Sequence, residues 1–114
     1  MGSQGRIGGN AMATLRDRTI KASNVTEKDK YIKNIQGTSL NIQVDGSCKL
    51  SISGGHSNTI EGPNYALTGI NMSTLEKVSN ISSPGLYLFI IEGLDEIELN
   101  LSGTGTIHWK EMGD

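Results

Sequence analysis

The chain has 114 residues, of which 35% are apolar and 4% aromatic, and its formal net charge is −2. This length supports one domain with a modest core, and no apolar run approaches the roughly 18 residues that a membrane-spanning helix needs. The slightly acidic balance gives no argument for a nucleic-acid partner, and the single cysteine excludes an intrachain disulfide.

Charge is distributed unevenly along the chain. Residues 1–33 carry a net charge of +4, whereas residues 34–114 carry −6. A basic segment on an acidic body predicts that the segment docks onto another surface, such as a neighbouring copy of the body. Arg16, Arg18 and Lys21 are the candidate contact residues of this segment. A solvated N-terminus would explain the same distribution, so both interpretations stay open.

The first 30 residues show no regular apolar period. Residues 1–11 (MGSQGRIGGNA) look like an expression leader, which makes Met12 the expected native start. They do not form a secretion signal, because no apolar segment follows them. Residues 12–30 carry three isolated apolar side chains at five-residue spacing, which fits neither a helix nor a strand. We expect an extended basic arm at residues 12–30, ordered by its contacts if it is ordered at all.

Residues 31–114 are expected to form the β-domain, which opens with two alternating runs. The inward positions of these runs are Leu40, Ile42 and Val44, then Cys48, Leu50 and Ile52. A three-residue loop, Asp45–Ser47, would pair Val44 with Cys48 and place both runs on one apolar face. The pattern therefore predicts a β-hairpin with a glycine bulge.

The middle of the chain gives weaker signals. Gly54–Asn64 has loop composition with one residue, Ile60, that we expect to be buried. Tyr65–Met72 reads as a short strand. In Ser73–Ser83, apolar residues recur every three positions, which fits one helical turn or two bends around a short strand.

The stretch Leu86–Trp109 is the most apolar part of the chain and predicts a three-stranded meander. Loops at Glu92–Asp95 and Gly103–Gly105 would align two apolar rows on neighbouring strands. These rows are Leu88–Leu99–Trp109 and Leu86–Leu101–Ile107. Trp109 is therefore expected inside the core.

The opposite face of the same meander carries Tyr87, Phe89 and Ile91. Exposed apolar patches of this kind usually mark an interface. These three residues are the candidate interface, covered either by the chain itself or by a partner. Together the segments predict an all-β fold, a small antiparallel β-sandwich or jelly-roll-like domain with an extended N-terminal arm. A core this small is marginal alone, so a homo-oligomer is expected.

No constellation of catalytic or metal-binding residues is recognisable. His56 and His108 lack the spacing of a metal site, and Cys48 has no neighbouring base motif. The acidic residues at positions 92–98 fit a solvated strand edge better than a glycosidase pair. We expect no enzymatic activity, no cofactor and no metal. A carbohydrate-binding module remains the alternative, with Trp109 or Tyr65 as the sugar platform and a cell-surface glycan as partner.

Residues 69–110 resemble small β-sandwich modules of tailed bacteriophages and prophages. The resemblance rests on SPGLYLFIIEGLDEIEL followed by GTGTI, a succession of short strands and glycine turns. Such modules occur in virion accessory proteins, including head fibres, capsid decoration proteins and tail or receptor-binding parts. The resemblance implies a non-enzymatic structural protein, made in the host cytoplasm and carried on the virion. It further implies a homotrimer that contacts other virion proteins. From its composition and charge, we expect neither a membrane nor a nucleic acid as partner.

Overall fold

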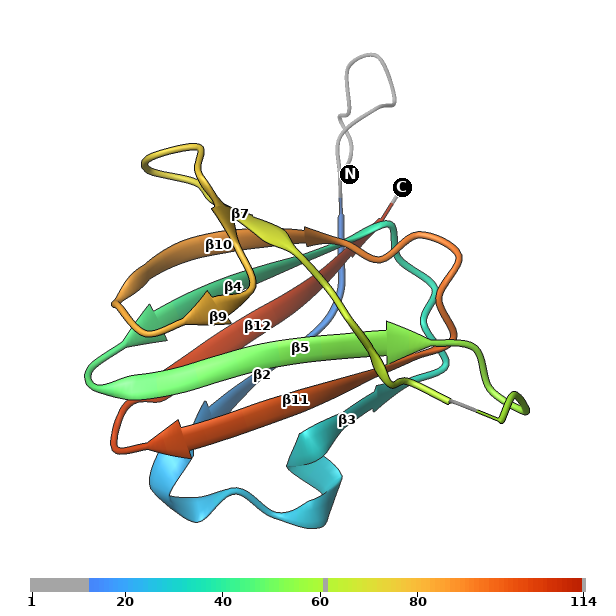
Figure 1. Ribbon diagram of the computed structural model, residues 1–114, viewed down its shortest axis with the longest axis horizontal. Coiled ribbons are helices and arrows are strands. Elements are labelled where there is room, and N and C mark those ends of the chain that lie inside the picture. Colours follow the sequence, from blue (N-terminus) through green and yellow to red (C-terminus); the bar gives the residue numbers. More distant parts are fainter. Residues whose placement is uncertain (1–12, 61, 114) are drawn as a thin grey trace, which may run out of the picture.

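Two antiparallel β-sheets pack face to face in the computed structural model, which describes residues 13–60 and 62–113 (Figure 1). The expected leader and Met12 lie outside the described residues. The larger sheet contains six strands, which run in this order across the sheet: β2 (Ala13–Lys21), β12 (Thr106–Gly113), β4 (Ser39–Asp45), β10 (Gly85–Ile90), β7 (Gly69–Asn71) and β8 (Lys77–Val78).

The smaller sheet has five strands, with β9 beside β5 and off the main path. They are β3 (Tyr31–Lys33), β11 (Glu96–Gly103), β5 (Cys48–Gly55), β6 (Tyr65–Ala66) and β9 (Asn80–Ile81). Two 3-10 turns, η1 (Ala22–Asn24) and η2 (Glu27–Lys30), join β2 to β3. Because β2, β3, β4 and β5 alternate between the sheets, as do β10, β11 and β12, the topology is that of a jelly roll. The all-β sandwich expected from the sequence is confirmed.

The hairpin expected between the two runs at residues 40–52 is wrong. Strands β4 and β5 belong to opposite sheets, and β4 pairs instead with β10 and β12. Their six inward side chains are all buried, from Leu40 at 0% to Cys48 at 3% exposure. The alternation therefore identified the buried positions correctly. It could not separate pairing in one sheet from facing across two, because both arrangements bury the same residues.

The expected meander is wrong for the same reason. Strands β10 and β12 lie in the larger sheet and flank β4, whereas β11 pairs with β3 and β5 in the smaller one. Leu99, Ile107 and Trp109 are buried as expected. The two faces of β10 are the reverse of those expected, however. Tyr87, Phe89 and Ile91 point into the core, and Leu86 is exposed. Since β10 is apolar on both faces, its own pattern does not show which face is inside.

Glycines allow two of the links that connect the sheets to lie close together. The β4–β5 and β11–β12 links lie against each other, and the Thr104 N–H donates to the Ser47 carbonyl at 2.8 Å. Gly103 has φ +100°, which favours glycine, and a Cβ on Gly105 would lie 2.2 Å from the carbonyl oxygen of Asp45. The two links can approach this closely only without side chains.

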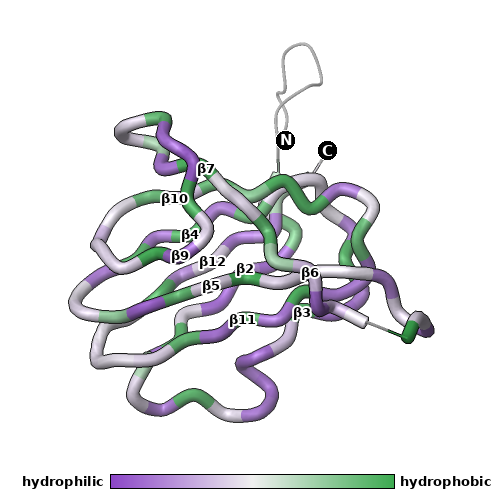
Figure 2. The backbone as a smooth tube through the Cα atoms, viewed as in Figure 1, coloured by the Kyte–Doolittle hydropathy of each residue, from purple (hydrophilic) through white to green (hydrophobic). Residues whose placement is uncertain are grey.

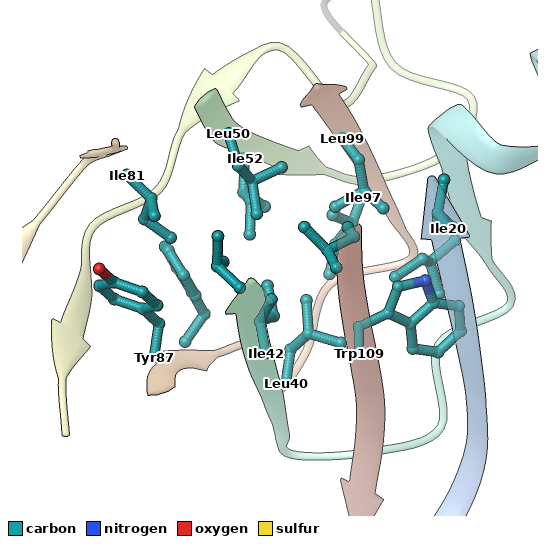
Figure 3. Close-up of a cluster of buried hydrophobic side chains, with 14 of the residues drawn as sticks. Ile20, Leu40, Ile42, Leu50, Ile52, Ile81, Tyr87, Ile97, Leu99 and Trp109 are labelled. Atoms are coloured by element: carbon teal, nitrogen blue, oxygen red, sulfur yellow. The ribbon is translucent and has the colours of Figure 1, made fainter. Parts of the chain in front are cut away.

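The core fills the space between the two sheets (Figure 3). Hydrophobic and hydrophilic residues alternate along the long strands (Figure 2), as expected for a sheet with one buried face. The buried apolar side chains are Ile20, Ala22, Ile32, Leu40, Ile42, Val44, Cys48, Leu50, Ile52, Ile81, Tyr87, Phe89, Ile91, Ile97, Leu99, Ile107 and Trp109.

The basic segment is part of the sandwich rather than an arm beyond it. Strand β2 pairs with β12 from Lys21↔Thr106 to Ala13↔Gly113, with a bulge between Glu111 and Met112. Its Ile20 is buried in the core. The expected boundary at residue 31 is therefore not seen among the described residues, because β2 forms an edge of the larger sheet.

Two local expectations also change. Residues 73–83 contain the turn of the β7–β8 hairpin, where Leu75 has φ +64°, and then strand β9, so they form no helical turn. This agrees with the alternative of bends around short strands. Ile60, expected to be buried, is 103% exposed in the loop after β5.

Candidate functional site

An apolar strip on the outer face of the larger sheet is one candidate contact surface. It consists of Ile70 and Met72, at and just after β7, and Leu86, Leu88 and Ile90 on β10. Leu88 and Ile70 are direct cross-strand neighbours, and the Met72 N–H donates to the Leu86 carbonyl at 2.9 Å. Ile90 is 68% exposed, and Ile70, Met72 and Leu86 are each 41–42% exposed. Leu88 is half-buried. The strip is a flat surface on which another protein can pack.

The sequence predicted that Tyr87, Phe89 and Ile91 form the interface, but in the structure the apolar strip is the exposed face of β10. Those three side chains are 2%, 1% and 0% exposed, so they cannot meet a partner. The Tyr87 hydroxyl is also satisfied internally, since it donates to the Ser83 carbonyl at 2.7 Å. The sequence did contain the signal for the strip. A strand that is apolar at every position must present one apolar face outward when its other face lies in the core.

The candidate contact residues of the basic segment lie on β2. Arg16 stands opposite Glu111 on β12, and Arg18 stands opposite Trp109. Directly opposed residues point to the same face of a sheet, so both arginines lie on the inner face, at the open edge of the sandwich. Lys21, at the end of β2, is exposed. Thus two of the three expected docking cations are held in intramolecular contacts.

Glu111 is the centre of a buried polar cluster that the sequence analysis missed. Its side chain is 1% exposed and forms an ion pair with Arg16. The backbone N–H groups of Gln36 and Gly37 each donate to Oε2 at 2.7 Å. Burial alone would raise the pKa of this carboxyl, but these hydrogen bonds and the Arg16 charge outweigh burial and lower the pKa. Arg16 also donates to the carbonyls of Lys33 and Asn34, which ties β2 to the end of β3.

A second ion pair joins β2 to the η2 turn. Arg18 contacts Asp29, which is 8% exposed. The Thr26 N–H and hydroxyl both donate to Asp29 Oδ2 at 2.9 Å, in a capping box. The backbone hydrogen bond from Thr26 is the largest influence on this carboxyl. With the Thr26 hydroxyl and Arg18 it outweighs burial and lowers the pKa of Asp29.

Trp109 carries an unpaired donor beside these ion pairs. It is 6% exposed, and among the described residues its Nε1 is the one buried side-chain nitrogen or oxygen without a hydrogen-bond partner. Such a group costs about 1–3 kcal/mol. In Figure 3 the indole lies next to the β2 strand, at one side of the core. Trp109 is therefore a core residue, as expected, and it is too buried to be a sugar platform.

A hollow follows this edge of the sandwich. A cavity of about 210 Å³ is lined by Trp109 and Ile32, three cations and further polar residues, namely Arg16, Arg18, Lys28, Asp17, Asp29 and Tyr31. A wider hollow of about 490 Å³ shares Arg16, Lys28 and Tyr31 with it and continues to Glu27, Lys33 and Asn34. We call the two together the edge cleft.

The other sugar-platform candidate, Tyr65, is accessible. Its side chain is 65% exposed on β6. It lines a hollow of about 450 Å³ together with His56, Ile60, Leu67 and Leu94. The loop that carries His56 is held by acidic residues of β11 and the preceding turn. The Ser57 N–H donates to Asp95 at 2.9 Å, and its hydroxyl donates to Glu96 at 3.2 Å.

The described residues offer little reactive chemistry. No group of three His, Cys, Asp or Glu side chains gathers within residues 13–60 and 62–113. Cys48 is buried, and burial, followed by the nearby Asp45 charge, raises the pKa of its thiol. His108 Nδ1 lies 2.5 Å from the Thr19 hydroxyl on the outer face of the larger sheet. In the same part of the chain, no helix is long and apolar enough to cross a membrane.

Comparison with known proteins gives one informative likeness. No protein-family model matches the chain, and no curated protein matches it in sequence. The crystal structure of the SPBc2 prophage-derived protein YomS superposes with a TM-score of 0.61 at 14% sequence identity. The match covers 95% of this chain and 100% of that one. At this identity the likeness establishes a shared fold, and the fold is one that a prophage-derived protein uses over its full length.

Proposed function

We propose that this chain is a structural or accessory protein of a phage or prophage virion, which acts through protein–protein contacts and without catalysis. The observation that carries the proposal is the end-to-end likeness to a prophage-derived jelly roll. The positions that fit are capsid decoration, a head fibre or a tail-associated part. The protein would be made in the host cytoplasm and carried on the virion.

The apolar strip is the contact surface in this proposal. Removing a large apolar side chain fully from water contributes about 1.5–3 kcal/mol, and the residues of the strip, of which Ile90 is 68% exposed, can each contribute a part of that on contact with a partner. The first partner is a second copy of the chain, because a small core gains stability from association. The resemblance to phage accessory modules makes a homotrimer the expected assembly. Other virion proteins are the further partners.

The oligomeric state tests this proposal. Ile90→Asp places a charge in the centre of a contact that would be desolvated, so we expect it to convert the assembly to a monomer in light scattering. Ile60→Asp is the matched control, since Ile60 is also exposed but lies in the loop after β5, away from the strip. A wild-type protein that is monomeric at high micromolar concentration, or equal dissociation by both variants, contradicts the proposed contact.

A carbohydrate-binding module is the second candidate, and the exposure of Tyr65 beside a hollow favours it. An aromatic ring of this kind can stack on a sugar ring, with the loop after β5 supplying polar contacts. Tyr65→Ala would then abolish glycan binding in calorimetry or on a glycan array, whereas Tyr65→Phe would keep it. Binding that survives Tyr65→Ala argues against this candidate.

A further inference from the structure

We propose that the edge cleft binds a small carboxylate-bearing molecule, whose carboxylate accepts hydrogen bonds from Arg18, Lys28 and Trp109 Nε1. This inference is independent of the virion role, because the edge cleft and the apolar strip lie on different strands. Nothing in the comparisons assigns a ligand to this edge.

The first argument is the unpaired donor. Trp109 lines the smaller cavity, and its Nε1 lacks an acceptor among the described residues. An indole N–H can only donate, so the missing partner must be an acceptor. Arg18 is the direct cross-strand neighbour of Trp109 and is 47% exposed. Its exposed side chain can shift to let an oxygen atom reach the indole nitrogen.

The second argument is the surplus of donors around that nitrogen. The ion pair of Arg18 with Asp29 is formed through Nη2 alone, whereas a guanidinium offers five N–H groups in a fixed fork. Lys28 takes part in none of the ion pairs recorded for the described residues. A carboxylate has the geometry to accept from an arginine fork and from a neighbouring ammonium at once.

The third argument is the charge balance, which selects a monoanion. Among the cations of the smaller cavity, Arg16 is paired with Glu111 and Arg18 with Asp29, which leaves the charge of Lys28 as the single surplus. Asp29 is held ionised by Thr26 and Arg18, which lower its pKa. A phosphate dianion would add repulsion from the nearby carboxylates, whereas a carboxylate balances the single surplus charge.

The shape of the edge cleft indicates the rest of the ligand. The wider hollow of about 490 Å³ continues from the cavity past Tyr31 to Lys33 and Asn34. Lys33 Nζ lies 5.6 Å from the centroid of the Tyr31 ring, so a cation already occupies one face of this aromatic. A polar body with hydroxyl groups fits these surroundings better than an apolar one. A sugar acid, such as a uronic acid, has both parts.

The indole N–H signal of Trp109 tests the proposal directly, since the chain has one Trp and so one indole signal. We expect glucuronate and acetate, added to the full-length ¹⁵N-labelled protein, to move this signal downfield in a saturable way. Glucose and inorganic phosphate should leave it in place. No saturable shift with glucuronate, or an equal shift with glucose or phosphate, overturns the proposal.

Two exposed lysines provide the matched variants. Lys28→Gln should weaken glucuronate binding roughly three- to tenfold, because it removes a charged hydrogen bond. Lys21→Gln makes the same charge change at an exposed lysine of the β2 edge, but Lys21 does not line the edge cleft, so its affinity should match the wild type. Equal weakening by both variants would mean general attraction to a basic edge and would overturn the site.

Discussion

Arg16 on β2 and Glu111 on β12 stand directly opposite each other and form an ion pair, although Glu111 is only 1% exposed. Arg16 also holds the end of β3 through two backbone carbonyls. One side chain therefore connects the edge strand of the larger sheet with the edge strand of the smaller sheet. This contact therefore joins the two sheets at the edge formed by β2 and β3.

Removing Arg16 should destabilise the protein markedly. Arg16→Ala leaves Glu111 buried without its cation, and breaking a fully buried pair costs about 3–5 kcal/mol. We expect a loss of about 2–3 kcal/mol in the free energy of unfolding, because Arg16 itself is 40% exposed and two backbone N–H groups still bind Glu111. Urea unfolding measures this loss. Lys110→Ala, on the exposed side of the same strand, is the control, and an equal loss there would contradict the prediction.

The two buried carboxyls should make stability depend on acid pH. The folded-state pKa values of Glu111 and Asp29 are lowered from ordinary values of 4.5 and 3.8. A lowered folded-state pKa adds stability above the ordinary value, and this stability is lost as the pH falls through the folded-state value. We therefore expect the free energy of unfolding to be level near neutral pH and to fall below about pH 4.5.

Charge-neutral variants identify the source of this pH dependence. Glu111→Gln should be less stable than the wild type at neutral pH, yet its free energy of unfolding should fall less steeply in acid. Glu92→Gln removes an exposed carboxylate and should keep the wild-type slope. The prediction fails if the slope of Glu111→Gln matches that of the wild type in urea titrations between about pH 3 and pH 7.

Neighbouring substitutions on β10 test which of its faces is buried. Phe89→Ala should cost about 3–5 kcal/mol, because the ring is 1% exposed in the core. Ile90→Ala should cost less than about 1 kcal/mol in the monomer, because that side chain is 68% exposed. Thermal or urea unfolding of both variants gives the comparison. The reverse order of losses would mean that the sequence-based face, with Leu88 inside, was right.

The sequence predicted which side chains are buried better than it predicted which strands pair with each other. Alternation placed Ile42 and Leu50 inside, and both are buried. It also paired them as neighbours in one sheet, whereas they lie on different sheets that enclose the same core. A period of two residues records which side of a strand meets the core. It holds no information on which strand lies opposite.

One feature of the sequence could have predicted the ion pair beside the edge cleft. Ile107, Trp109 and Glu111 alternate along β12 with the polar residues Thr106, His108 and Lys110. An acidic residue at an expected inward position requires a buried cation, and β2 was the segment with cations to offer. The unpaired indole nitrogen could not be foreseen, because it depends on the distance between side chains from β2, β12 and η2.

The pairing of β2 with β12 has a consequence for how the protein is made. Residues 13–21 reach their place in the larger sheet only against residues 106–113. On a ribosome, β2 therefore has no partner until β12 has left the exit tunnel. Domains closed by such distant pairings fold slowly and expose strand edges in the meantime. We infer that this jelly roll closes only once β12 is available, and that the basic strand β2 must stay solvated until then.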